Sequence, residues 1–186
     1  CHCQSRFQAE GLRAAIERRF AECGLELNLQ KTRVVYCKDD KRRSTYSDEK
    51  FDFLGFTFRP RWAKSRWGKY FIGFSPAISN EATKSIRSTV RSWRLHRRSD
   101  KSLGDLAQMY NPIIRGWINY YGSYYRSALY RVFYQLSRSL IRWAMRKYKK
   151  LRGHTQRAAY WLGRIALRDP NLFAHWQMGM RPTAGR

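Results

Sequence analysis

The sequence predicts an α+β protein, and three observations carry that prediction. Aromatic residues alternate with other residues over 51–58, which is typical of a β-strand. After Pro76 the apolar residues recur with the helical period instead. The segment 126–150 then has the clearest amphipathic helical pattern of the chain. We therefore expect a small antiparallel β segment with one helix over 1–75, an all-α helical bundle over 76–176 and a tail over 177–186.

The charge of the chain is strongly positive and uneven. The 186 residues carry 38 Lys and Arg against 13 Asp and Glu, a formal net charge of +25. Residues 1–50 contribute 11 cations and 8 acids, whereas residues 51–186 contribute 27 cations and 5 acids. A polyanion is the expected partner, and nucleic acid is the usual one. A membrane surface is second, but the predicted basic faces lack a free apolar side, and no apolar stretch is long enough to span a bilayer.

The cysteines indicate the redox compartment of the chain, and the first residue indicates whether the chain is a fragment. Four scattered cysteines are too few for a disulfide framework. Cys1 and Cys3 flank His2, but no second Cys/His cluster follows at a zinc-type spacing. We predict no metal site and buried free thiols in a reducing cytoplasm. Because the chain opens with Cys1 and shows no signal peptide, we expect a fragment of a longer cytoplasmic protein.

The first fifty residues give one helix and one turn. Ser5 can begin a helix that Gly24 ends, with Phe7, Leu12, Ile16 and Phe20 facing inward. Leu25–Cys37 reads as two short strands around a turn at 30–32.

The segment 38–50 is a polar loop that contains one pair of adjacent carboxylates. Asp39 and Asp40 lie between basic residues and away from any hydrophobic strand. A two-metal site needs carboxylates that hold ions about 4 Å apart. We therefore predict a solvated loop at this pair.

The aromatic strand is interrupted at Leu54-Gly55. A glycine inside a strand pattern suggests a bulge or a close backbone approach. Residues 59–69 follow as a basic loop with Trp62 and Trp67, and 69–74 as the returning strand. Basic residues between aromatics suit phosphate contact and base stacking, which contributes about 1–3 kcal/mol per base.

Two helices follow Pro76. Ser79 or Asn80 begins the first, which runs to about Leu95. Its buried face comprises Ala82, Ile86, Val90 and Trp93, and its basic stripe Lys84, Arg87, Arg91, Arg94 and Arg98. Ser102 and Asp105 form the capping-box pattern of the second, which leads to a break before Pro112.

The segment 111–122 then reads as a separate helix. Asn111 can cap it, Pro112 fits its first turn and Gly122 can end it. Gly116 in the middle of a helix costs about 1 kcal/mol relative to Ala. We therefore expect a neighbouring helix or a ligand to approach the backbone there.

The segment 126–150 is predicted to be one helix with an apolar and a basic side. Its apolar side comprises Leu129, Val132, Phe133, Leu136, Leu140, Trp143 and Ala144. Arg131, Arg138, Arg142 and Lys149 fall within about 20° of a common direction on the opposite side, with Arg146 near them. A solvated face usually mixes signs, so the absence of acids favours phosphate binding. A helix over 154–167 and a turn over 172–176 follow, with His154 and His175 in structural roles.

Several motifs resemble one family. Asn-Pro-x-x-Arg-Gly-Trp-x-Asn-Tyr-Tyr-Gly over 111–122 resembles the signature of the maturase-specific (X, or thumb) domain of group II intron-encoded reverse transcriptases. The run Arg-Trp-x-x-Arg-Lys-Tyr over 142–148 and the ending over 172–176 also fit. Upstream, 24–32 resembles the palm segment after the catalytic aspartates, and 51–58 resembles the primer-grip strand.

The resemblance implies roles for individual residues. It places the end of the palm, incomplete, over 1–75 and the thumb over 76–176. The RNA-binding residues expected from the signature and the basic faces are Arg87, Arg91, Arg94, Asn111, Arg115, Gly116, Trp117, Asn119, Tyr120, Tyr121, Arg131, Arg138, Arg142, Arg146, Lys147, Lys149, Lys150 and Arg152. The primer-grip-like residues are Phe53, Leu54, Gly55 and Phe56, for which a plain aromatic hairpin strand is a compatible alternative. Lys31 matches the lysine near the nucleotide phosphates, and a solvated turn lysine is its alternative. The catalytic Tyr-x-Asp-Asp motif is missing, so we expect no catalytic residue, and Mg²⁺ only with the missing palm half or the ribozyme.

The expected function is that of an RNA-binding fragment of a bacterial group II intron maturase that assists intron folding and splicing. Its expected partners are group II intron RNA, an RNA/DNA primer-template and the N-terminal reverse transcriptase half, with no membrane. One alternative is the C-terminal part of a split or truncated RNA-directed DNA polymerase that is active only with its N-terminal half. Another is a decayed remnant. We also expect 1–75 to be only marginally ordered alone.

Overall fold

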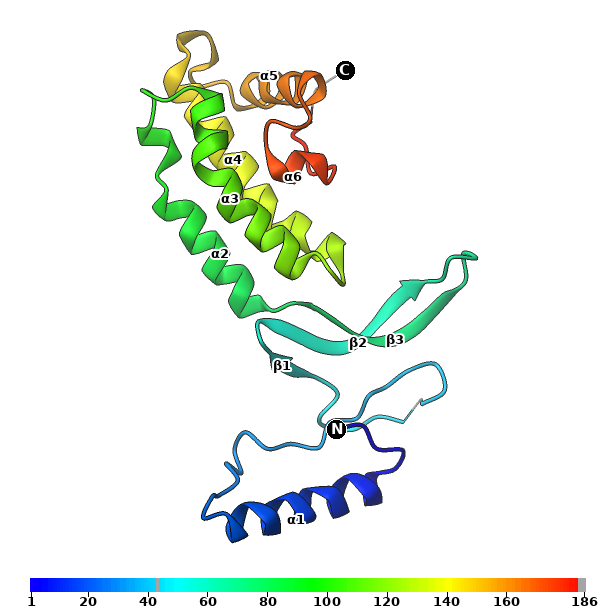
Figure 1. Ribbon diagram of the computed structural model, residues 1–186. Helices are drawn as coiled ribbons and strands as arrows, with labels where there is room; N and C mark the ends of the chain where they lie inside the picture. The colour runs from blue at the N-terminus through cyan, green and yellow to red at the C-terminus, as the bar shows by residue number, and fades with distance from the viewer. Residues whose placement is uncertain (43, 184–186) are drawn as a thin grey trace. The chain divides into compact units, whose positions relative to one another are not determined.

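The computed structural model describes residues 1–42 and 44–183, and the chain divides into two compact units. The first comprises 1–51 and 59–74, and the second, which we call the helical unit, comprises 52–58 and 75–186. A three-stranded antiparallel sheet in the order β1-β2-β3 precedes most of the helices (Figure 1). The predicted α+β class is therefore confirmed. Arg43 of the predicted loop and residues 184–186 of the predicted tail lie outside the described residues.

The first helix begins and ends as the sequence predicts. Helix α1 covers Arg6–Glu22, and the Ser5 hydroxyl accepts a hydrogen bond from the Gln8 amide at 3.2 Å. Its predicted inward face is wrong, because no residue of α1 is buried and Phe7 is 86% exposed. The other apolar residues of this face, such as Leu12 and Phe20, are not buried against another element either. Leu12 and Ile16 line an open cavity of about 780 Å³ shared with the segment 32–37.

The two strands predicted over 25–37 are wrong, whereas the turn between them is confirmed. The side-chain oxygen of Asn28 accepts bonds from the Gln30 and Lys31 amides, both at 3.1 Å. No strand is assigned among residues 25–37. An alternating pattern becomes a strand only where a neighbour supplies the ladder hydrogen bonds, and the backbone bond from Tyr36 to Asp48 at 2.8 Å does not extend into a ladder.

The adjacent carboxylates lie in a loop, as predicted. Asp39 accepts bonds from the amides of Lys41 and Arg42, both at 2.9 Å. Asp40 accepts a bond from the Ile72 amide at 2.9 Å. Each carboxylate therefore binds backbone donors, and no group of three metal-ligating side chains occurs within residues 1–42 and 44–183.

The predicted interruption of the aromatic strand is a hairpin turn. Strand β1 covers Phe51–Phe53 and β2 covers Phe56–Lys64. Between them Leu54 has φ +48° and Gly55 has φ +77°, as a two-residue type I′ turn requires. The aromatic segment is thus a hairpin, and Gly55 belongs to its turn and not to a bulge. The close approach is also present, because a Cβ on Gly55 would lie 2.9 Å from the Tyr121 hydroxyl.

The basic loop predicted over 59–69 is mostly strand. Strand β2 continues to Lys64 and β3 covers Tyr70–Ile78, so the turn is confined to 65–68. Pro60 is tolerated because β1 is too short to pair with β2 there. Pro76 does not mark the change of period, since it lies inside β3, the last strand in the sheet order.

The helical unit has one hydrophobic core. Its elements are α2 (Asn80–Ser92), η1 (Leu95–Arg97), α3 (Leu103–Tyr121), η2 (Arg126–Leu129), α4 (Tyr130–Lys147), η3 (Lys149–Leu151), α5 (Thr155–Arg168) and α6 (Ala174–Gln177). The Ser79 hydroxyl caps α2 by accepting from the Ala82 amide at 3.0 Å. The predicted apolar residues of α4 are all buried in this core, and so are Ile86 and Val90 of α2.

The predicted break at residues 111 and 112 is wrong. Helix α3 runs through Pro112, and its start is the predicted capping box of Ser102 and Asp105. Asn111 does not cap a helix. Its amide nitrogen donates to the Leu172 carbonyl, and its oxygen accepts from the Ala174 amide, both at 2.9 Å. These bonds and the buried side chains of α3 hold the helix across the backbone bond that proline cannot make. Helix α3 ends before Gly122, as predicted.

Helix α4 is shorter than the segment 126–150 predicted for it. It ends at Lys147, because Tyr148 takes an extended conformation with φ −106° and ψ 116°. A 3₁₀ turn lies on each side, and Lys149 belongs to the second one. Lys149 therefore does not continue the helix that carries Arg131, Arg138 and Arg142, and its predicted position on their face is wrong.

His175 is the most deeply buried titratable side chain described. It is 0% exposed and packs against the rings of Phe133, Phe173 and Trp176. Neither of its ring nitrogens has a hydrogen-bond partner among the described residues. Burial lowers the pKa of His175 to about 3.

Acid should therefore destabilise the helical unit through His175. The folded-state pKa lies below the unfolded value near 6.5, so stability is constant above that pH and falls as the pH drops toward 3. At pH 5 we expect a loss of about 2 kcal/mol. Urea unfolding at pH 7.5 and pH 5 measures it, with His175→Phe as the matched variant. The same loss in both proteins would contradict this origin.

Candidate nucleic-acid interface

The first basic face lies on α2 and the residues after it. Lys84 and Arg91 are exposed, and Arg87 is half-buried. Arg87 donates to the Arg131 carbonyl at 3.1 Å, which joins α2 to the start of α4. Arg94 follows Trp93, the C-cap residue of α2, and it is exposed with φ +46°. The predicted stripe on α2 is thus solvent-facing except where Arg87 braces α4.

The second basic face is a row of four exposed arginines on α4. This α4 arginine row comprises Arg131, Arg138, Arg142 and Arg146. Its last three members are four residues apart, so each rises about 6 Å along the helix from the one before. The opposite side of α4 packs into the core. Guanidinium groups at this spacing on a rigid helix suit a run of backbone phosphates.

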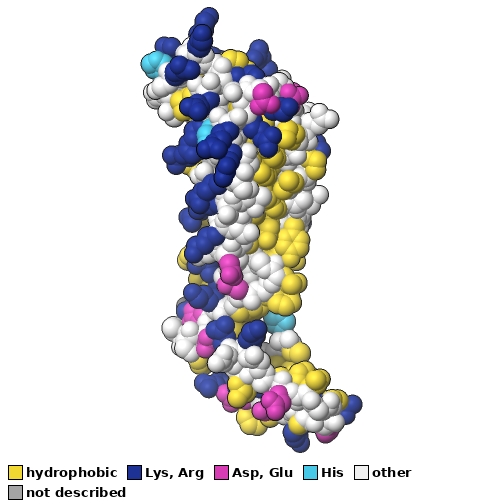
Figure 2. Space-filling model, turned by 90° about the vertical axis from the view of Figure 1, so that its left-hand side faces the viewer, with side chains coloured by type: hydrophobic (Ala, Val, Ile, Leu, Met, Phe, Trp, Pro, Cys, Tyr) yellow, Lys and Arg dark blue, Asp and Glu magenta, His cyan; other side chains and the backbone are white. Residues whose placement is uncertain are grey.

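Two acids of the same unit, Asp100 and Asp105, have partners of their own. Asp105 accepts from the Ser102 amide in the capping box, which lowers its pKa. Asp100 pairs with Lys101 at 3.3 Å, and hydrogen bonding to Lys101 lowers its pKa. No ion pair among the described residues includes a member of the α4 arginine row. Figure 2 shows Lys and Arg side chains along one margin of the helical unit, beside a column of hydrophobic ones.

Lys147 differs from the other predicted cations, because it also holds the backbone. It donates to the carbonyls of Ser99 and Lys101 at 2.9 and 2.7 Å. Trp143 donates to the Arg98 carbonyl at 2.9 Å. Together these bonds fix the connection between α2 and α3 against α4. Two of the three Lys147 donors therefore have protein partners.

The cations after α4 surround a concave site of about 550 Å³. Tyr148 and Trp161 lie with their ring centroids 4.9 Å apart in its wall. The other lining residues are Lys147, Lys149, Lys150, Leu151, Arg157 and Arg164, whereas the nearby Arg152 is exposed outside this set. Sequence reasoning missed Arg157 and Arg164. Their signal was a spacing of four and then three residues around Trp161, which places all three on one face of α5.

The signature residues of α3 divide between core and surface. Trp117 and Tyr121 are half-buried, and Trp117 stacks on Trp93 with centroids 5.7 Å apart. Arg115, Gly116 and Asn119 are exposed. A Cβ on Gly116 would meet no described atom within 4 Å. A neighbouring helix is therefore not what Gly116 accommodates, and the expectation of a ligand stays a prediction.

The residues that resemble a primer grip pack against the end of α3. The Tyr120 hydroxyl donates to the Leu54 carbonyl at 2.9 Å, and Phe56 is buried against the Tyr120 and Tyr121 rings at 5.3 and 5.4 Å. Phe53 and Leu54 are exposed. Burial raises the pKa of Tyr121. The turn at Leu54-Gly55 is thus held by the signature helix, a contact that the sequence did not indicate.

Lys31 and the cysteines lie in the first unit. Lys31 is exposed in the turn that Asn28 closes. All four cysteines are free, with Cys1 and Cys23 exposed and Cys3 and Cys37 half-buried. The predicted burial of the thiols is therefore wrong, because these residues lie at the ends of α1 and in a loop and not in a core.

Two further properties restrict the kind of interface. Within the described part of the chain no helix is long and apolar enough to cross a membrane. The surface assembled above is basic, rigid where it lies on α2 and α4, and interleaved with aromatic side chains. Such a surface can neutralise and position a phosphate backbone.

The comparisons with known proteins agree with this geometry. No curated protein and no solved structure matches the chain. Residues 83–161, less than half of the chain, match the family model described as group II intron, maturase-specific domain. This segment contains most of α2, all of α3 and α4, and half of α5. The resemblance to the maturase-specific domain of group II introns is therefore confirmed over residues 83–161.

Proposed function

We propose that the helical unit binds structured group II intron RNA and assists its folding for splicing. The observation that carries the proposal is the match over 83–161, because that segment includes the α4 arginine row. Four exposed arginines without acidic partners among the described residues are free to bind an external anion, and an RNA backbone supplies phosphates in a row.

The proposed mechanism is electrostatic and positional. Arginines of α2 and α4 replace the counterions of crowded phosphates, and release of these ions drives binding. Arg115, Asn119 and Tyr120 of α3 supply hydrogen bonds toward the RNA, and the bare backbone at Gly116 permits close approach. The protein breaks no bond in this account, since splicing chemistry belongs to the intron RNA.

The remaining residues receive a proposal of their own. We assign 1–75 to the end of a reverse transcriptase palm and 76–176 to the maturase-specific region. Phe53–Phe56 would contact a primer end, and Lys31 would lie near nucleotide phosphates. These roles require carboxylates that the described residues do not bring together, so they belong to an assembly with further palm residues.

The test compares a folded group II intron domain with a scrambled RNA of equal length across a salt series. We expect tighter binding to the intron domain that persists at moderate salt. Phosphate contact alone gives a log–log slope of about −0.7 to −0.9 per contact for any sequence. Equal affinities and equal slopes for both RNAs would overturn the proposed function.

A further inference from the structure

The hairpin formed by β2 and β3 presents aromatic side chains to solvent. Trp62 is 65% exposed, Trp67 is 82% exposed and Tyr70 is 64% exposed. Large aromatic side chains usually bury most of their surface in a fold or an interface. Three of them exposed within nine residues form an aromatic surface that is open to solvent.

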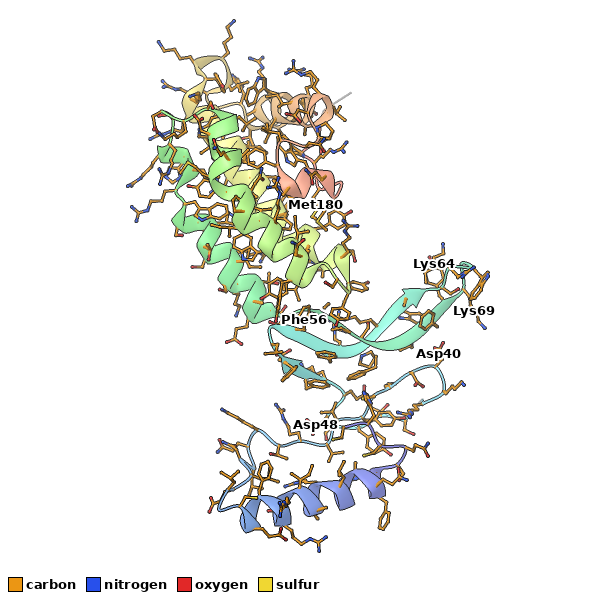
Figure 3. All side chains as sticks on the ribbon, in the orientation of Figure 1. Asp40, Asp48, Phe56, Lys64, Lys69 and Met180 are labelled. Atoms are coloured by element: carbon orange, nitrogen blue, oxygen red, sulfur yellow. The ribbon has the colours of Figure 1, made fainter. Side chains whose placement is uncertain are left out.

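The backbone places these residues around one end of the hairpin. Ser65 and Lys69 close the turn through a backbone bond of 2.8 Å. Lys64 and Tyr70 therefore lie opposite one another, and Trp62 shares the face of Lys64 because it is two residues away. Trp67 lies in the turn itself. Figure 3 shows Lys64 and Lys69 at this end of the hairpin.

Cations accompany the rings closely. The Arg66 guanidinium carbon lies 4.8 Å from the centroid of the Trp67 ring. The Lys64 ammonium lies 5.4 Å from the centroid of the Tyr70 ring. Each cation covers one face of a ring, and the high exposure of the ring leaves surface for another partner. The sequence has no acidic residue between Asp52 and Glu81. One acid from elsewhere in the chain, Asp40, contacts this strand pair by accepting a hydrogen bond from the Ile72 amide.

We propose that the β2–β3 hairpin binds unpaired RNA, with Trp62, Trp67 and Tyr70 as stacking platforms and Lys64, Arg66 and Lys69 as phosphate contacts. Aromatic rings beside cations bind single strands, because every unpaired base offers a flat face and every nucleotide a phosphate. A duplex hides those faces in its own stack. A membrane interface would instead need a free apolar side, whereas here cations lie over the rings.

This site is separate from the proposed maturase surface. The end of the hairpin over 62–70 lies outside residues 83–161 and in the first compact unit, and its ligand is a single strand of any sequence. A chain without preference for an intron could therefore still bind unpaired RNA here. A negative result for intron binding would therefore not contradict the single-strand site, and a negative result for the single-strand site would not contradict intron binding.

The test uses the full chain with Trp62→Ala and Trp67→Ala combined. The probes are an unstructured RNA of about 12 nucleotides, an RNA duplex of the same length and linear polyphosphate. We expect single-strand affinity to fall at least about thirtyfold at an unchanged salt slope, because two stacking rings are lost and the phosphate contacts remain. Affinities for the duplex and polyphosphate should not change.

Two further variants separate stacking from folding. Trp67→Tyr keeps a stacking ring and should bind the single strand nearly as the parent does. Phe7→Ala removes an equally exposed ring from α1 and should change nothing. Undiminished single-strand binding in the double variant would overturn the proposal. Anionic phosphatidylserine vesicles serve as a fourth probe. Equal losses for all three polyanions, or a loss seen only with these vesicles, would overturn the proposal as well.

Discussion

Replacing Arg138, Arg142 and Arg146 together by glutamine is expected to lower the affinity for intron RNA about a hundredfold at 0.1 M salt. Each guanidinium that neutralises a phosphate releases one counterion, so the log–log salt slope should become about 2–3 less steep. The three side chains are exposed on α4 and make no ion pair among the described residues. Their loss should leave the free energy of unfolding nearly unchanged. Fluorescence anisotropy across a salt series measures both quantities.

The matched control removes the same charge from α1. Arg6, Arg18 and Arg19 become glutamine there, where Arg6 pairs with Glu10 and Arg19 with Glu22. Acids beside these arginines disfavour a phosphate, so this variant should lose little affinity. A loss as large as that of the α4 variant would mean that net charge, and not the α4 arginine row, determines binding.

Asn111→Ala is expected to destabilise the helical unit by about 2–4 kcal/mol. The substitution removes two hydrogen bonds of 2.9 Å and leaves the Leu172 carbonyl and the Ala174 amide without these partners. A buried polar group without a partner loses more than the net value of its bond. Urea or thermal unfolding followed by circular dichroism measures the change.

Asn119→Ala is the control for that measurement. It changes the same residue type on the same helix and brings the same gain in helix propensity. Because Asn119 is exposed, its replacement should leave stability within about 0.5 kcal/mol of the parent. Equal stability of both variants would show that the bonds of Asn111 contribute nothing.

Local rules predicted the helices better than they predicted the strands. Ser5, Ser79 and Ser102 cap helices through bonds within three residues, which depend on little beyond the local sequence. The alternation over 25–37 gave no strand, because a strand needs a partner supplied from elsewhere. Pro112 misled for a related reason, since distant bonds to Asn111 help to hold α3 across it.

The candidate surface was likewise predictable where one helix carries it. The α4 arginine row follows from spacing alone, and its residues lie where the period places them. The second role of Lys147 was hidden, because its partners Ser99 and Lys101 lie more than forty residues away. The packing of Leu54 against Tyr120 joins positions 66 residues apart, and no local pattern indicates it.

The bonds of Asn111 have a consequence for how large this module is. They join α3 to 172–174, and Phe173, Trp176 and Met180 are buried in the same core. The segment recognised by family comparison ends at 161, before all of these residues. The smallest piece that can melt as one cooperative unit is therefore longer than the piece that is recognised. A boundary for expression chosen at the edge of the match would cut through the core.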